Sequence, residues 1–269
     1  MRDLFEYKEI IYGLAMRDLK LRYQKPFLGF LWMLIMPFSM AVIYKILFSD
    51  FMRVNSGSYP FFIHLITALL PWNYFISSVQ GANRCILDNK TLFNQASFPK
   101  RLLPVSVVLA NLLNFLPSLL VLLIFLAAFH VKISILLFFL PAIILIQTSL
   151  ALGLAFLVSA LQVIYRDTEY ITQVIFSVLF FLTPGVYVLE EVISRAHPFW
   201  VNLYMFNPLV GILNLYRIIF IGDYLKGAPH EINFLNTVVS PILCSSALLF
   251  IGYFVFKKLE SRFFEYLNV

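Results

Sequence analysis

The sequence predicts an all-α membrane protein with six transmembrane helices, an N-terminal amphipathic interface helix and short re-entrant outer helices before the last span. Of its 269 residues, 61% are hydrophobic and only 13% are charged, and the mean hydropathy is +0.87. A soluble domain is about a quarter charged, so this chain has too few charges to cover a surface in water. Long uncharged stretches and an uneven distribution of basic residues complete the prediction. We expect residues 1–269 to form a single transmembrane domain.

Residues 1–26 are expected to form the interface helix. They hold ten charged residues and lack the apolar core that a cleavable signal peptide requires. Arg17 and Lys20 recur on one face at helical spacing, while Ile11 and Leu14 lie on another face. Such a helix lies in the plane of the membrane surface. It either sets the topology of the chain or presents a surface to a cytoplasmic partner, and the two roles are compatible.

Six later stretches are long and apolar enough to cross a membrane, for which a helix needs about 20 residues. The segment 190–235, before the last of them, contains a seventh uncharged stretch that is interrupted by Asn207 and Pro208. Irregular backbone at membrane depth is tolerated where protein buries it, so we expect short re-entrant or interfacial helices there. Residues 27–189 hold spans one to five. The six predicted spans are residues 27–49, 61–83, 105–129, 134–160, 170–189 and 236–256.

The basic residues orient the chain. With six spans, fourteen of the 20 Lys and Arg residues fall on one side of the membrane, five fall on the other, and Lys45 lies within the first span. The positive-inside rule then places both termini in the cytoplasm. The formal charge of +6 is therefore a signal of orientation, and we expect no nucleic-acid partner. The basic side comprises residues 1–26, 84–104, 161–169 and the tail 257–269.

Two sets of side chains are candidates for lining a passage. Aromatic residues of the first span recur on one helical face that ends in Lys45. They either line a channel for sugars, which stack on aromatic rings, or face lipid while Lys45 extends to the outer interface. A line of polar residues on the second span either wets a pore or hydrogen-bonds to neighbouring helices. The candidates are Phe27, Phe30, Phe38, Tyr44, Lys45, Phe48, Asn73, Ser77 and Gln80.

The sequence contains none of the common motifs of an enzyme. The P-loop pattern GxxxxGK[ST] is absent, as are HExxH, GxSxG and CxxC. We expect no catalytic residue, no metal site and no cofactor in this chain. No acidic residue lies inside a predicted span, which argues against proton coupling. If ATP drives a process here, another polypeptide must hydrolyse it.

Five short motifs, taken in order, resemble those of one family. Their order and spacing are similar to those of the ABC-2 type permeases, in the polysaccharide-export branch that includes O-antigen, teichoic-acid and related glycan exporters. The resemblance extends over nearly the whole chain. The motifs are Arg17–Tyr23 followed by Leu28–Trp32, then Leu69–Phe75, then Phe98-Pro99 with Leu103-Pro104, then Tyr165–Asp167, and finally Asn207-Pro208.

The resemblance implies a homodimer bound to two copies of a separate cytoplasmic ABC ATPase, and that ATPase holds the ATP and Mg²⁺. It implies that a lipid-linked polysaccharide moves outward across the inner (cytoplasmic) membrane, between two subunits surrounded by membrane lipids. It places the outer gate near Pro184, Asn207 and Pro208. It assigns the ATPase interface to Arg17, Asp18, Lys20, Arg22, Leu87, Asp88, Leu92, Phe93, Tyr165, Arg166, Asp167 and Glu169.

Two alternative functions stay open from the sequence. The first is an ABC-2 permease for a drug or a small lipid, which the 17% aromatic content and the match to the glycan branch disfavour. The second is an integral-membrane glycosyltransferase or acyltransferase. Such an enzyme should show acidic or His residues clustered at one membrane face, and the sequence shows no such cluster.

Overall fold

The computed structural model describes residues 7–23, 31–54, 59–89, 98–189, 193, 197–222, 224, 234–263 and 266. Within these ranges every regular element is a helix, in agreement with the predicted fold class. The elements are α2 (Lys8–Tyr23), α3 (Leu31–Tyr44), the π-helix η1 (Lys45–Phe51), α4 (Phe61–Asn83), α6 (Leu102–Ala128), the 3₁₀ helix η2 (Ile135–Phe139), α7 (Leu140–Ile164), α8 (Thr168–Phe181), α10 (Pro198–Met205), α11 (Pro208–Phe220) and α12 (Phe234–Glu260).

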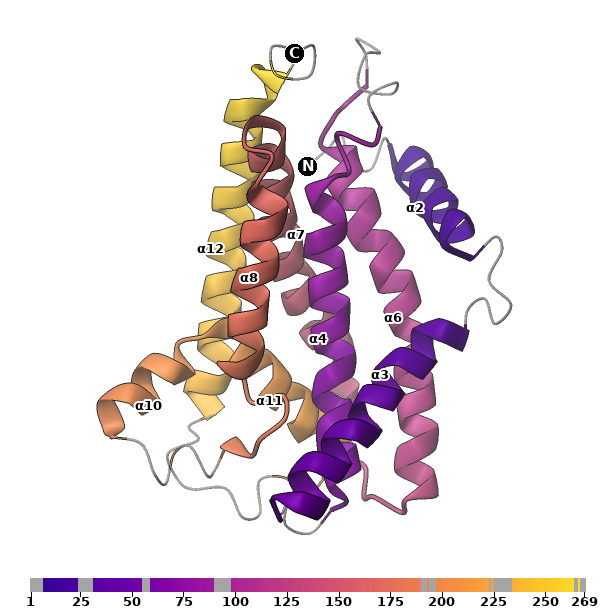
Figure 1. Cartoon of the computed structure of the whole chain (residues 1–269), viewed down its shortest axis with the longest axis vertical. Coiled ribbons are helices and arrows are strands. Elements are labelled where there is room, and N and C mark those ends of the chain that lie inside the picture. The colour runs from indigo at the N-terminus through magenta and orange to yellow at the C-terminus, as the bar shows by residue number, and fades with distance from the viewer. Residues whose placement is uncertain are drawn as a thin grey trace.

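The long helices stand roughly side by side, with α4 near the centre of the bundle (Figure 1). Five helices of the described chain are long and apolar enough to cross a membrane, and the bent pair α10–α11 provides a sixth candidate. The predicted second span, 61–83, has the bounds of α4. The predicted third, fourth and sixth spans differ by a few residues from α6, from η2 with α7, and from α12.

The predicted fifth span, 170–189, is wrong in its second half. Helix α8 ends at Phe181 after 14 residues, which at about 1.5 Å per residue is shorter than the roughly 30 Å hydrocarbon core. A turn at Thr183, Pro184 and Gly185 redirects the chain, and Val186 then packs into the bundle. Residues 183–186, 188 and 189 are buried in protein, which accounts for the apolar character of this part of the predicted span. The structure therefore contradicts one continuous helix over 170–189. That this segment crosses the membrane stays a prediction.

Helix α2 lies apart from the main bundle and packs along α6 (Figure 1). Its buried residues are Ile11, Leu14 and Ala15, so the face predicted to be apolar is the face that contacts the protein. Helix α3 and η1 follow, with Pro37 inside the helix, and cross in front of α4 in Figure 1. The start of the predicted first span, at residues 27–30, lies outside the described residues.

Helices α7 and α12 approach each other closely at two glycines. A Cβ atom on Gly153 would lie 2.5 Å from the carbonyl carbon of Leu248, and a Cβ on Gly252 would overlap the backbone of Gly153. Small residues of this kind let two helix backbones approach in a membrane. The two glycines come from different helices, so this seam lies within one chain and joins the last span to the bundle.

Helices α10 and α11 meet at Asn207 with a bend of 76°. The side chain of Asn207 accepts a hydrogen bond from the backbone N–H of Leu209 at 3.0 Å, and Pro208 occupies the first helical position, where it needs no N–H donor. Every residue from Leu209 to Phe220 is buried. Helix α11 is therefore a core element, and α4, α7 and α12 pack against it.

Candidate functional site

Three predicted partner-binding segments meet at one end of the bundle, which we call the basic end. It comprises α2, residues 84–89 after α4, and residues 165–169 between α7 and α8. The Nη2 atom of Arg17 donates to Oδ1 of Asn89 at 2.8 Å and to Oδ1 of Asp18 at 3.1 Å. Arg17 therefore links α2 to the turn that follows α4.

Arg84 links the same turn to α8. Its Nε atom lies 3.7 Å from Oδ1 of Asp88, and its Nη1 atom lies 4.0 Å from Oε2 of Glu169. The side chain of Arg84 is 60% exposed, and exposed ion pairs contribute only about 0–1 kcal/mol. These contacts therefore position the three segments without locking them together, which suits a surface that a partner displaces.

The remaining interface candidates differ in their environment. Tyr165, Arg166 and Asp167 are exposed at the loop between α7 and α8, and Lys20 is exposed on α2. Leu87 is half-buried, while Leu92 and Phe93 lie outside the described residues.

Arg22 faces α6 rather than the other interface candidates. Its Nη1 atom donates to Oδ1 of Asn111 at 2.8 Å, and the neighbouring hydroxyl of Tyr23 donates to Oδ1 of Asn114 at 3.2 Å. Burial against α6 raises the pKa of the Tyr23 hydroxyl. The end of α2 is thus anchored to α6 through two asparagines that the sequence analysis did not assign to the site.

A line of polar residues on α4 is open in the single chain. Asn73 and Ser77 are exposed, and Gln80 is half-exposed. Helical spacing continues this line to Arg84. On the neighbouring α8, Gln173 lies one turn after Glu169, which reaches Arg84, and Gln173 is exposed as well. We call Asn73, Ser77, Gln80 and Gln173 the polar face. It starts at the basic end and runs along two adjacent helices.

The aromatic stripe of the first span turns inward within this chain. The ring centroids of Phe38 and Phe125 lie 4.8 Å apart, and those of Tyr44 and Phe180 lie 5.9 Å apart. Phe48 lies edge-on to Tyr44 at 6.2 Å. The exposed face of the helix carries Met36, Met40, Ile43 and Leu47 instead.

Two further candidates of the first span lie outside the described residues, namely Phe27 and Phe30. Lys45, the cation at the end of the stripe, pairs through Nζ with Oδ2 of Asp50 at 2.9 Å, and both side chains are more than 40% exposed. The ring centroids of Trp72 on α4 and Phe180 on α8 lie 5.5 Å apart. Because Phe180 also packs against Tyr44, these rings connect the first span to α4. The polar face therefore ends, away from the basic end, at a group of aromatic rings.

The three outer-gate candidates lie together at the end of α8. Asn207 Nδ2 lies 3.4 Å from both the carbonyl oxygen of Leu182 and Oγ1 of Thr183. The carbonyl of Pro184 accepts a hydrogen bond from Arg217, and Pro208 begins α11 beside Asn207. The turn after α8 is therefore attached to the start of α11.

Arg217 is the residue that sequence reasoning missed. It is fully buried on α11, where its Nη2 atom donates to the carbonyl of Pro184, to that of Gly185 at 3.3 Å and to that of His64 at 3.5 Å. No carboxylate pairs with it among the described residues, and its Nε and Nη1 atoms have no partner there. A charged residue inside an otherwise apolar helix was the available signal. The count of basic residues places Arg217 only among the charges of the outer side.

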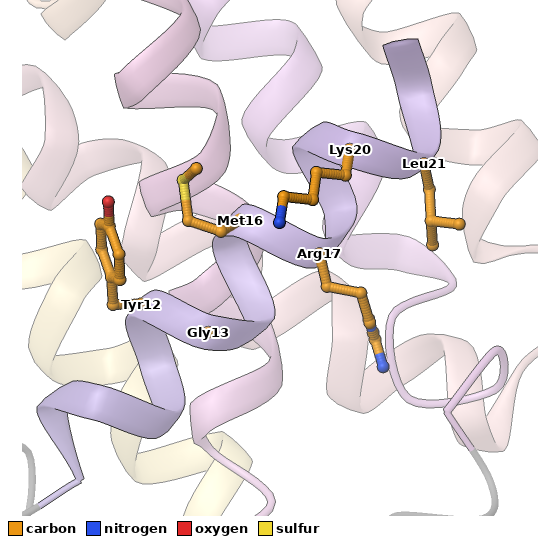
Figure 2. A pocket seen from close by; sticks show the side chains of 6 residues that line it. All are labelled: Tyr12, Gly13, Met16, Arg17, Lys20 and Leu21. Atoms are coloured by element: carbon orange, nitrogen blue, oxygen red, sulfur yellow. The ribbon is translucent and has the colours of Figure 1, made fainter. Parts of the chain in front are cut away.

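An open hollow of about 490 Å³ lies on the exposed side of α2. Figure 2 shows the bare ribbon of Gly13 between the side chains that surround it. Among the described residues that line it, Arg17 and Lys20 carry the charges. The lining residues are Tyr12, Gly13, Met16, Arg17, Lys20 and Leu21.

The described residues contain no group of three or more His, Cys, Asp or Glu side chains that could hold a metal ion. The arrangement instead offers three features that fit transport: an exposed partner surface, a polar face along two helices, and a buried junction at the far end of α8.

Comparison with known proteins gives two kinds of match. A family described as "ABC-2 type transporter" matches residues 10–221. The O-antigen export system permease protein RfbA of Myxococcus xanthus is 34% identical over 235 residues, which cover 85% of this chain and 86% of that protein. The protein of the same name from Klebsiella pneumoniae is 28% identical over 260 residues, which cover 96% of this chain and 95% of the relative.

Proposed function

Since the chain belongs to the ABC-2 type transporter family, we propose that it is the permease subunit of an ATP-driven exporter that moves a lipid-linked polysaccharide outward across the inner membrane. The observation that carries this proposal is the end-to-end similarity to permeases named for O-antigen export. The open polar face supports it, because uncharged amides and hydroxyls exchange hydrogen bonds with successive sugars without holding any one of them tightly.

A transporter of this family works with an ABC ATPase, and this sequence has no P-loop of its own. We place two copies of that ATPase at the basic end of a homodimer. The support is the adjacency of α2, residues 84–89 and residues 165–169, which Arg17 and Arg84 join. Arg166 and Asp167, exposed at the loop before α8, are well placed to receive the ATPase.

Coupling then follows from where α8 is attached. At the basic end, α8 is held by the long Arg84–Glu169 contact, and at the other end by the junction with α11. Along its length only Thr168, Thr172 and Phe176 are buried. Movement of the loop before α8 therefore shifts the helix against α4, where the polar face lies. Two copies facing each other across this surface enclose the polysaccharide.

The topology of the proposal follows the distribution of basic residues. Both termini lie in the cytoplasm, and α2 lies at the membrane surface as an amphipathic helix. Helices α10 and α11 enter and leave the membrane from the outer side as a re-entrant pair, which the 76° bend supports. The pair closes the outer end of the passage near Asn207.

The two alternative functions are less well supported. The curated relatives are named for O-antigen export, not for export of a drug or a small lipid. A transferase requires a site with nucleophilic, acidic or metal-binding groups. The described residues show exposed ion pairs of the kind formed by Arg84, and no cluster suited to a metal.

The test is reconstitution of transport. Proteoliposomes that contain this chain and the ABC ATPase encoded beside it are loaded with lipid-linked glycan and given Mg-ATP on the ATPase side. We expect glycan to become accessible to a glycosidase on the opposite side only when both subunits and hydrolysable ATP are present. Equal accessibility with a non-hydrolysable nucleotide would contradict the proposal, and so would a neighbouring gene set without any ABC ATPase.

A further inference from the structure

Gly13 is a helical glycine that has no structural reason within the described chain. It lies in the middle of α2, and none of the described residues comes within 4 Å of the position that its Cβ would take. The other helical glycines in the described ranges are packed. A Cβ on Gly153, Gly211 or Gly252 would lie within 3 Å of a neighbour, and a Cβ on Gly81 would lie 3.0 Å from a side chain of α6.

Gly13 lowers the stability of α2, and no contact among the described residues offsets this loss. Glycine in a helix interior is less stable than alanine because its backbone loses more conformational freedom on folding. At Gly153 the close approach of α12 explains that cost. At Gly13 none of the described residues does, and the exposed side of α2 has room there for a molecule that approaches from outside.

The surroundings of Gly13 form an open hollow along the exposed side of α2. Tyr12 and Met16 stand on one side of the bare ribbon, and Lys20 and Leu21 lie further along the helix (Figure 2). Tyr12 is 56% exposed and Leu21 is 60% exposed. The lining is therefore mostly apolar, with the cations of Arg17 and Lys20 beside it, around an open hollow of about 490 Å³.

We propose that the Gly13 hollow receives an apolar side chain of the ABC ATPase subunit, with an adjacent carboxylate of that subunit paired to Lys20. This inference rests on the proposed function and names the chemistry of one contact in it. The opposite face of α2 is already occupied, because Ile11 and Leu14 are buried in the protein. The hollow is also continuous with the basic end, since Arg17 lines it and bonds to Asn89.

A membrane lipid is the competing occupant. An acyl chain is fluid and fits around a methyl group as well as around a hydrogen, so lipid contact gives no reason for glycine at this position. A protein side chain has a fixed place in its own fold and requires matching space, because packed interfaces reach the density of protein interiors. The bare backbone at Gly13 therefore favours the ATPase.

The experiment compares Gly13→Leu with a matched control, Ala128→Leu, which adds a similar bulk at an exposed position at the opposite end of α6. Binding of each purified permease variant to the ABC ATPase that co-purifies with the wild type is measured in one detergent. We expect Gly13→Leu to weaken binding about tenfold or more, as overpacking a filled contact does. Gly13→Ala should weaken binding less than Gly13→Leu but by more than about threefold, because its methyl group takes up part of the matching space, and the control should stay within about threefold of the wild type.

The thermal midpoint of each permease alone separates a binding defect from misfolding. Because the site of Gly13 is open and leucine and alanine favour helices, neither substitution should lower that midpoint. Lys20→Gln should weaken ATPase binding by a few-fold and reduce its salt dependence.

Three results would overturn the inference. The first is an unchanged ATPase affinity in Gly13→Leu, and the second is a lowered thermal midpoint in that variant. The third is a Gly13→Leu variant that still binds the ATPase but no longer forms the permease dimer, which would assign the hollow to a second copy of this chain. If the wild-type permease binds no ABC ATPase at all, the proposed function itself fails. The two failures are therefore distinguishable.

Discussion

Replacing the buried Arg217 by methionine should reduce export while changing the stability of the fold little. This makes Arg217 the most informative position to substitute in the chain. The guanidinium donates through Nη2 to the carbonyls of Pro184 and Gly185. It thereby attaches the turn after α8 to α11. At the same time it is a buried charge without a carboxylate among the described residues, and two of its nitrogen atoms have no partner there.

The opposing contributions can be compared for Arg217→Met. Leaving the carbonyls of Pro184 and Gly185 unpaired costs about 1–3 kcal/mol each. Removing the ion offsets this, since the effective penalty for burying an uncompensated charge is several kcal/mol. We expect the free energy of unfolding of Arg217→Met to stay within about 2 kcal/mol of the wild type. Arg217→Ala should be about 2–5 kcal/mol less stable than Arg217→Met because it also leaves a cavity.

Arg217→Lys is the matched control. It keeps the buried charge but loses the planar fork that reaches two carbonyls at once, so it should be less stable than Arg217→Met. Thermal unfolding of the purified variants in one detergent gives this order, and surface glycan in cells gives the function. We expect all three substitutions to reduce export, because the turn after α8 is no longer held to α11. Wild-type export in Arg217→Met would show that export does not need the Arg217 contacts. Higher stability of Arg217→Lys than of Arg217→Met would show that the buried charge does not destabilise the fold.

Three further predictions use other parts of the structure. Gly252→Leu should abolish the monodisperse peak of the purified protein in size-exclusion chromatography, because the side chain would overlap the backbone of Gly153; a normal peak would show that α7 and α12 are further apart. Burial raises the pKa of the Cys85 thiol, so iodoacetamide should modify Cys85 at pH 8.5 only after unfolding. Rapid labelling of the folded protein would contradict the buried position. Because the thiol of the unfolded chain ionises at a lower pH than the thiol of the folded chain, the free energy of unfolding should also fall as the pH rises above about 8.5. Arg166→Glu, at an exposed site, should leave the permease folded but uncouple the two activities, so that the ATPase hydrolyses ATP without export of glycan. Normal surface glycan in this variant would show that the loop does not couple hydrolysis to export.

The long spans were predictable because hydropathy and length determine them. A helix in the hydrocarbon core must be apolar over about 20 residues, and α4 has the predicted bounds 61–83. The same criterion failed at 170–189, because apolar sequence does not distinguish burial in lipid from burial in protein. Pro184 and Gly185 were the local signal of a turn, and the structure places the chain after α8 within the bundle.

The side-chain environment of the site was only partly accessible from sequence. Helical periodicity correctly placed Asn73 and Ser77 on one face of α4. Periodicity also identified the aromatic stripe, but it cannot say what the stripe faces, and Phe38 packs on Phe125 from a helix far along the chain. The assignment of these residues to a passage stays a prediction, since it depends on a second copy.

Two features depend on pairs of residues that lie far apart in sequence. The Gly153–Gly252 seam joins residues of two helices, so no local motif reveals it. The attachment of Arg217 to Pro184 spans 33 residues and depends on the turn that the sequence analysis overlooked. Long-range contacts of this kind follow from the packing of the whole chain and not from local propensity.

We propose that this chain forms the passage of a polysaccharide exporter and that a separate ABC ATPase drives transport through it. The most direct measurement is surface glycan in cells that lack the chromosomal copy of this gene and carry it on a plasmid, with either the wild-type ATPase or one in which the P-loop lysine is replaced. We expect surface glycan only with the wild-type pair, and lipid-linked glycan retained inside the cell in every other combination. Surface glycan at the wild-type level in cells without this chain, or with the inactive ATPase, would contradict it.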